Sequence, residues 1–224
     1  MAEKLFPKGY QPIHQVSEKE DVRNQLLTTI LSDHSKEKEA KLDTDIFDVM
    51  SRRRSTRKFE SKAIEEWKIE KILAAADTAP TAGNFQGFEI FHVKDTKMKE
   101  KLVGAANKQP YVNAPLVLIY CKNPSRVKLN FSKKMLTKFA IQDATLAAAY
   151  SQLAATALGL SSIWIGMIDE EKVAKIIGTK LVPSSILCIG YPTKQKLPKS
   201  RRNLSELIHV LEPKKIAKIT KKKV

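Results

Sequence analysis

Cysteine and histidine are scarce in this sequence, and their scarcity argues against two kinds of site. Only two cysteines and four histidines occur among 224 residues. Cys121 and Cys188 each lie inside an apolar run, which predicts buried free thiols and no disulfide. The histidines are not spaced with cysteine or acidic residues as zinc ligands are. We therefore expect no metal centre.

Acidic residues are few relative to basic ones. The chain has 24 Asp and Glu against 40 Lys and Arg, which gives a formal net charge of +16. Such a charge first suggests nucleic acid or an anionic membrane surface as partner. Much of it, however, lies in a tract from Lys122 to Lys138 and in a C-terminal tract from Lys214 to Lys223 that lacks aromatics. The C-terminal tract is typical of a solvated chain end, so nucleic-acid binding is disfavoured as the main function.

Long uncharged runs are absent except between Asp143 and Asp169. That run is long enough to cross a bilayer, but it is rich in Ala, Ser and Thr, and Gly159 interrupts it where a helix would end. It therefore predicts a buried helix followed by a strand. The first ten residues are followed by polar residues and not by the apolar stretch of a signal peptide. We expect a cytoplasmic protein without membrane contact.

Hydrophobic periodicity predicts a mixture of helices and short strands, and hence the α+β class. The longest helix, about Phe139 to Leu158, is small or apolar on nearly every face, so protein must cover it on all sides, either from the same chain or from a second copy. Shorter helices are predicted at 46–50 and at 64–76, the second with Ser61 as a candidate N-cap and an end near Pro80. The predicted strands are Phe88 to Val93, Leu116 to Cys121, Ile163 to Ile168 and Ile186 to Ile189.

Three parts are predicted along the chain. Residues 1–43 form a helical extension, in which the apolar residues Val22, Leu26, Leu27, Ile30 and Leu31 recur at helical spacing. Residues 44–210 form the main domain, and residues 211–224 form a Lys-rich tail. No composition typical of a flexible linker separates them.

Two motifs carry chemistry. Guanidinium groups and a hydroxyl are concentrated from Arg53 to Arg57, which is what binding a phosphate monoester requires, although a basic cluster at a helix end also serves the helix dipole or solubility. In the segment Pro80 to Gln86, small residues admit a flat ligand, and Asn84 and Gln86 offer both donors and acceptors, as the pyrimidine edge of a flavin needs. An ordinary turn has similar composition.

Two more motifs complete a pattern: the segment from Gly159 to Gly166 and the sequence Gly190-Tyr-Pro192 followed by Pro198-Lys-Ser-Arg201. In this order the four motifs resemble the nitroreductase family, over roughly residues 45–208. The resemblance implies a small mixed or antiparallel sheet flanked by helices, with the long central helix at a dimer interface.

The resemblance also implies FMN as cofactor, NADH or NADPH as electron donor, and a small acceptor such as a nitroaromatic or a quinone, in ping-pong order. The phosphate would be held from both ends of the domain, and the ring would lie between two subunits of a homodimer, with Arg57 near N1. No residue must act as a covalent nucleophile. The implied cofactor-binding residues are Arg53, Arg54, Ser55, Arg57, Thr81, Ala82, Asn84, Gln86, Trp164, Ile165, Gly166, Lys199 and Arg201.

The chain departs from the family pattern at two positions: Gly87 stands where many relatives have proline, and Met167 stands where many have a second glycine. These changes leave the acceptor open. Two alternatives therefore remain. A related flavoprotein could catalyse reductive dehalogenation or ene reduction, and a basic nucleic-acid-binding protein could use the same fold as a scaffold.

Overall fold

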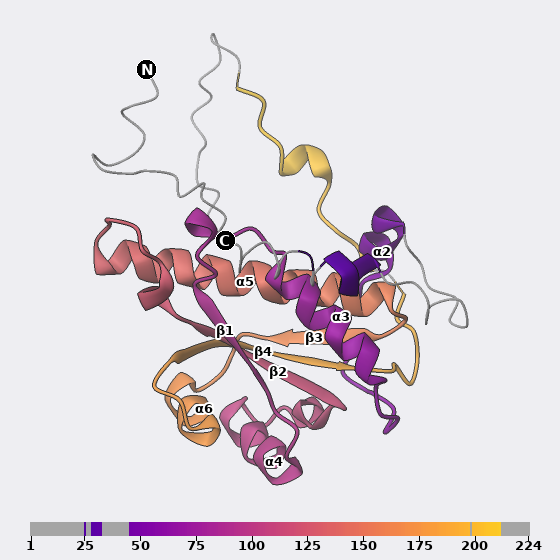
Figure 1. Ribbon diagram of the computed structural model, residues 1–224. Helices are drawn as coiled ribbons and strands as arrows, with labels where there is room; N and C mark the ends of the chain where they lie inside the picture. Colours follow the sequence, from indigo (N-terminus) through magenta and orange to yellow (C-terminus); the bar gives the residue numbers. More distant parts are fainter. Residues whose placement is uncertain (1–24, 26–27, 33–44, 198, 212–224) are drawn as a thin grey trace.

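The computed structural model describes residues 25, 28–32, 45–197 and 199–211 (Figure 1). Residue 25 and residues 28–32 are helical, within the predicted N-terminal helix. Most of the predicted extension and nearly all of the predicted tail lie outside the described residues, so the division into three parts stays a prediction.

Four antiparallel strands form the sheet, in the order β1-β2-β4-β3. They are β1 (Phe88–His92), β2 (Leu116–Lys122), β3 (Ser161–Ile165) and β4 (Val182–Gly190). The two central strands are apolar and almost wholly buried, because helices cover both faces of the sheet. The predicted α+β class is confirmed, and the sheet is antiparallel throughout.

Helices α3 (Glu66–Asp77) and α5 (Lys133–Ala157) pack on one face of the sheet, and α4 (Thr96–Ala105) and α6 (Glu170–Ile177) pack on the other (Figure 1). Alternate residues along a strand join different clusters: Leu118 joins the cluster under α5, and Val117 joins the one over α4. A short helix, α2 (Ile46–Arg52), contacts α5.

The long helix α5 begins six residues before its predicted start at Phe139. Ser132 caps it by accepting a hydrogen bond from the Met135 amide at 3.4 Å. Its small residues, among them Ala144 and Ala147, are fully buried against α3 and the sheet. Its opposite side, with Leu146 and Tyr150, is exposed in the single chain, so this chain alone does not cover the helix on all sides.

Several local predictions are corrected. Ser61 does not cap α3, because the helix starts at Glu66 with Glu65 in the capping position and no side-chain cap. The third strand ends at Ile165, not at Ile168. Helices α4 and α6 were not predicted, although Asp95 and Asp169 accept backbone hydrogen bonds as their N-caps. No helix in the described ranges is long and apolar enough to cross a membrane.

Candidate functional site

Residues 53–59, which we call the arginine segment, lie along the β3 edge of the sheet. Arg53 follows α2 directly, and Ser55 forms a parallel bridge with Ser162 of β3. The Thr56 amide donates a 2.9 Å hydrogen bond to the Ser162 carbonyl. The first and third predicted motifs are therefore side by side, because backbone pairing aligns the segment with β3.

Neighbouring side chains of this segment point to opposite sides of the sheet. The Arg57 guanidinium carbon lies 6.0 Å from the centre of the Tyr111 ring, and Phe59 packs into the cluster on the α4 side. Thr56 is buried and faces a cavity that the α5 residue Thr156 also lines. This alternation is what an extended backbone produces.

Arg53 lies close enough to Arg201 for the two positive charges to interact. The pKa of Arg53 is lowered, first by burial and then by the positive charges of Arg201 and Arg54. Among the described residues neither Arg53 nor Arg201 forms an ion pair with a carboxylate. Two guanidinium groups that repel each other can bind an anion between them, because its negative charge would neutralise both.

The segment that carries Arg201, which we call the arm (residues 192–211), is tied to the arginine segment. Lys196 donates a 3.1 Å hydrogen bond from Nζ to the Ser55 carbonyl. The Glu60 amide donates to the Tyr191 carbonyl at 2.8 Å, just before the arm. Lys199 is exposed, two residues before Arg201. The arm thus brings the two basic motifs from opposite ends of the domain together.

The Asn-Gln turn is held by a residue that sequence reasoning missed. Asp143 of α5 is buried and accepts 3.0 Å hydrogen bonds from the amides of Ala82 and Gly87. Burial raises the pKa of Asp143, and the two backbone hydrogen bonds oppose that rise without cancelling it. In the sequence, the signal that could have pointed to Asp143 was a single acidic residue within a stretch of helix that is otherwise small and apolar.

The backbone of this turn is strained. Gly83, Asn84 and Gln86 have φ values of 57°, 58° and 44°, a region that non-glycine residues seldom occupy. The side-chain nitrogen Nε2 of Gln86 donates to the Asn84 carbonyl at 2.7 Å and to the Asn84 side-chain oxygen at 2.6 Å. Thr81 accepts a 3.2 Å hydrogen bond from the Gln86 backbone amide. Strain of this kind is typical of a functional turn.

The structure explains why glycine stands at position 87. Its amide donates to Asp143, which a proline could not do. A Cβ atom added there would lie 2.7 Å from Val127 Cγ2 and 2.9 Å from Asp143 Oδ2. This position therefore requires both an N–H group and the absence of a side chain.

Within one chain, the predicted cofactor residues form two groups. The Asn-Gln turn precedes β1, whereas the arginine segment and Gly166 lie at β3, and β2 and β4 stand between them. Three strand spacings separate the two edges by roughly 14 Å. Next to the second group, Trp164 is 39% exposed, Ile165 is buried and Gly166 is exposed.

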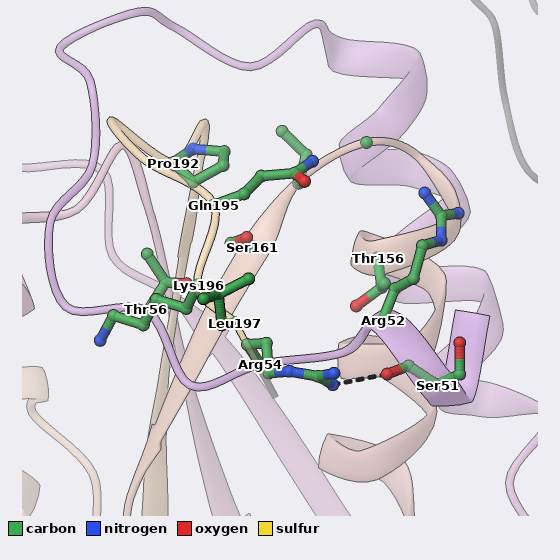
Figure 2. A pocket seen from close by; sticks show the side chains of 12 residues that line it. Ser51, Arg52, Arg54, Thr56, Thr156, Ser161, Pro192, Gln195, Lys196 and Leu197 are labelled. Carbon is green, nitrogen blue, oxygen red and sulfur yellow. Dashed lines mark hydrogen bonds between the residues drawn. The ribbon is translucent and has the colours of Figure 1, made fainter. Parts of the chain in front are cut away.

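Cavities adjoin both groups. An open hollow of about 550 Å³ lies beside the turn, between Thr81, Ala82 and the α5 residues Phe139, Gln142 and Leu146. A second cavity, of about 440 Å³, lies behind the arginine segment, and Figure 2 shows the side chains that line it. Among them are Arg52, Arg54, Thr56, Thr156, Ser161 and Lys196. The sequence did not predict this second cavity.

Comparisons with solved structures define the class of the protein. A Bacillus megaterium structure named NfrA1 aligns with a TM-score of 0.68 at 29% identity, covering 75% of each chain. The NADPH:FMN oxidoreductase of Vibrio harveyi, complexed with NAD⁺, aligns with a TM-score of 0.70 at 22% identity, covering 77% of this chain and 79% of that one. The molecule therefore has the nitroreductase-like α+β fold.

Sequence comparisons then give the family. The model described as "Nitroreductase family" matches residues 50–115 and 105–191. A protein of Archaeoglobus fulgidus, named as a candidate NADH dehydrogenase/NAD(P)H nitroreductase, is 32% identical over 151 residues, which are 64% of this chain and 83% of that protein. The FMN reductase [NAD(P)H] of Bacillus subtilis is 27% identical over 164 residues, 66% of each chain. The chain belongs to the nitroreductase family, and it is an oxidoreductase of that family.

Proposed function

We propose that this protein binds FMN and transfers electrons from NADH or NADPH to a small acceptor, such as a nitroaromatic or a quinone, in ping-pong order. The observation that carries the proposal is that Arg53 and Arg201, from distant parts of the chain, lie close enough for their charges to interact. Among the described residues, neither forms an ion pair with an acidic side chain. The names of the relatives support the choice of flavin and nicotinamide.

The residues present fit a phosphorylated flat cofactor. Arg53, Ser55, Lys199 and Arg201 would bind the phosphate, since guanidinium and hydroxyl groups supply charge-assisted donors. Arg54, also predicted for this group, lies beside Arg53 and donates from Nη1 to its carbonyl at 2.8 Å, so it would act by holding the Arg53 backbone. Arg57 would place a positive charge beside N1 of the ring.

The two groups at opposite edges of the sheet suggest how the ring would be enclosed. Thr81, Ala82, Asn84 and Gln86 of one copy would face the strand end of a second copy, where Trp164, Ile165 and Gly166 lie. The exposed side of α5 would supply the contact between copies. When bound, FMN supplies the ring that accepts electrons from the nicotinamide and passes them on, while these residues orient it and exclude water.

The first experiment is the visible absorption spectrum of purified protein after incubation with FMN and gel filtration, before and after anaerobic addition of NADH or NADPH. We expect flavin bands that co-elute with the protein and bleach with one of the donors. Protein that stays colourless after FMN is added would overturn the proposal. Bands that persist with both donors would overturn the nicotinamide step only.

A separate variant tests whether Arg53 and Arg201 bind the FMN phosphate. The double variant Arg53→Gln/Arg201→Gln should lose FMN on gel filtration, since each charged hydrogen bond contributes about 1.5–3 kcal/mol. The matched control is Arg126→Gln, which removes an exposed arginine that pairs with Glu89 at 3.2 Å, at the opposite, β1 edge of the sheet. Retention of FMN by the double variant would exclude these residues as the phosphate site.

A further inference from the structure

The segment between β2 and α5 lies against the turn proposed to hold the flavin ring. The Asn123 amide donates a 2.8 Å hydrogen bond to the carbonyl of Gly87, at the end of the turn. A Cβ atom added to Gly83 would lie 3.4 Å from Leu129 Cδ2, so Leu129 borders the turn itself. The segment continues into α5, where Phe139 lines the open hollow beside the turn. It therefore borders both the turn and the hollow.

The hollow suits a flat apolar ring. Its volume of about 550 Å³ is within the range of small-molecule sites, and most of its wall is apolar. The ring of Phe139 is held by Phe131, which meets it edge to face with the ring centroids 5.6 Å apart, so the hollow offers a fixed aromatic wall. Because Thr81 and Ala82 belong both to the hollow and to the proposed ring site, a molecule seated here would lie next to the flavin ring.

Positive charge gathers on one side of this hollow. From Asn123 to Gln142 the chain has no acidic residue, but it has five basic ones. These are Arg126, Lys128, Lys133, Lys134 and Lys138. Arg126 pairs with Glu89 at 3.2 Å, whereas none of the four lysines forms an ion pair with a described acidic side chain. The basic tract that first suggested a nucleic-acid partner thus borders a small-molecule hollow.

Lys138 is the cation best placed to meet a ligand in the hollow. It precedes Gln142 by four residues and Leu146 by eight, so the three side chains share one face of α5. Gln142 and Leu146 line the hollow. Four residues of helix advance about 6 Å, so Lys138 stands one turn before Gln142, at the end of the hollow where Phe139 lies. The Lys138 side chain is exposed and can turn toward a ligand.

Among the residues that line the hollow, Asp143 alone is acidic, and its carboxylate is engaged with the turn. Its two oxygens accept the amides of Ala82 and Gly87. Asp143 lies five residues after Lys138, about 7.5 Å further along the helix axis. An anionic group is therefore favoured at the Lys138 end of the hollow and disfavoured at the Asp143 end. A ligand with a flat apolar part and one anionic end fits this division.

We propose that the acceptor is a flat aromatic molecule that carries a carboxylate, with its ring in the hollow and its carboxylate toward Lys138. This inference rests on the proposed function, because it names the class of acceptor for the same site. The other lysines of the tract need not touch the acceptor. They raise its local concentration, since a surface with charge of one sign attracts the opposite charge over about 10 Å at moderate salt.

The test compares two acceptors of nearly the same shape: 4-nitrobenzoate, which is an anion, and 4-nitrobenzamide, which is neutral. Each takes two electrons from the reduced flavin and two protons, which gives the nitroso compound and water. Anaerobic stopped-flow absorbance follows the reoxidation of FMN-loaded protein that was first reduced with dithionite, so no nicotinamide cofactor is present to compete for the lysines. The measured quantity is the ratio of the two second-order rate constants, carboxylate over amide.

We expect Lys138→Gln to lower this ratio about two- to fivefold, the range for one pair of charges that water can reach. Lys138→Glu should lower the ratio further, and added salt should lower it in the unaltered protein. The matched control is Lys101→Gln, which removes an exposed lysine of α4, on the other face of the sheet. The control should keep the ratio of the unaltered protein.

A ratio that Lys138→Gln leaves unchanged, or that Lys101→Gln lowers equally, would overturn the carboxylate site while leaving the proposed function in place. Protein that keeps no FMN, by contrast, would overturn the proposed function and this inference with it. If the reduced protein transfers electrons to neither compound, equilibrium dialysis of 4-nitrobenzoate against the FMN-loaded protein decides. Binding that is weakened by Lys138→Gln and not by Lys101→Gln would support the site, and no binding or equal binding by both variants would exclude it.

Discussion

At the scale of single residues, Asp143 has the most consequences for the candidate site. Its carboxylate accepts both the Ala82 and the Gly87 amides, and so connects the long helix to the strained turn that carries Asn84 and Gln86. A turn with several residues at positive φ persists only where its surroundings hold it. The geometry of the turn therefore depends on one buried acid 56 residues from Gly87 in the chain.

Removing this carboxylate should destabilise the protein and release the turn. Asp143→Ala leaves two amides without an acceptor, which costs about 1–3 kcal/mol for each donor that stays buried. Asp143→Asn keeps one acceptor oxygen and should lose less. Urea unfolding measures both losses, and hydrogen exchange of the Gly87 amide reports on the turn. Unchanged exchange in Asp143→Ala would show that the turn holds itself.

Gly87 should not tolerate a side chain. Gly87→Ala would bring a methyl group within 2.7 Å of Val127 Cγ2, so we expect a loss of about 1–3 kcal/mol from overpacking. Gly104→Ala is the matched control, because it lies within α4 and its Cβ would meet nothing within 4 Å. That change should stabilise the helix by about 0.5–1 kcal/mol. The thermal unfolding temperatures of the two variants should therefore shift in opposite directions from that of the unaltered protein.

At the scale of secondary-structure elements, one cluster joins the start of α3 to Tyr191, the residue just before the arm. The Tyr191 hydroxyl donates to Glu65 Oε2 at 2.5 Å and accepts from Lys68 Nζ at 2.7 Å, and Lys68 is buried. Burial alone would raise the pKa of Glu65, but the hydrogen bond from Tyr191 and the charge of Lys68 lower it on balance. Tyr191 itself, mainly through burial, has its pKa raised to about 12.

Tyr191→Phe should therefore lower stability and weaken the arm. It removes two hydrogen bonds to charged groups, and we expect a loss of about 1–3 kcal/mol near neutral pH. Because the folded-state pKa of Glu65 is lowered, the stability it contributes is present above the ordinary Glu pKa and disappears as pH falls through the lowered value. The difference in free energy of unfolding between the unaltered protein and the variant should become smaller in acid. Urea unfolding at several pH values tests this, and a difference that becomes larger in acid would contradict the assignment.

At the scale of the whole molecule, apolar surface gathers on one side. The exposed apolar residues of α2, α5 and the arm include Ile46, Phe47, Met50, Met135, Ile141, Leu146, Tyr150, Leu204, Leu207 and Ile208. In Figure 1 the arm leaves the body on the side of α5, away from the sheet. Exposed apolar residues gathered in this way indicate a contact with another protein chain, and a second copy is the partner that the proposed function requires.

A charge placed on α5 should separate the copies and release the flavin. Leu146→Glu puts a carboxylate on the exposed side of α5, where the side chain is 38% exposed in the single chain. Val182→Glu is the matched control, at 39% exposure on β4. Light scattering should show a monomer for the first and a dimer for the second, with FMN retained only by the second. A dimeric Leu146→Glu would place the interface elsewhere.

Local patterns in the sequence were enough for the α+β class, the four strands, the long helix and the family, since hydrophobic periodicity and short motifs act within a few residues. They did not reveal Asp143 as the support of the turn, the Tyr191 cluster or the cavity behind Arg54, because each is formed by residues far apart in the chain. Backbone pairing with β3 decided which arginines meet Arg201 and which line the cavity. A one-residue shift in that pairing would exchange the two sets, and only the packed sheet determines it.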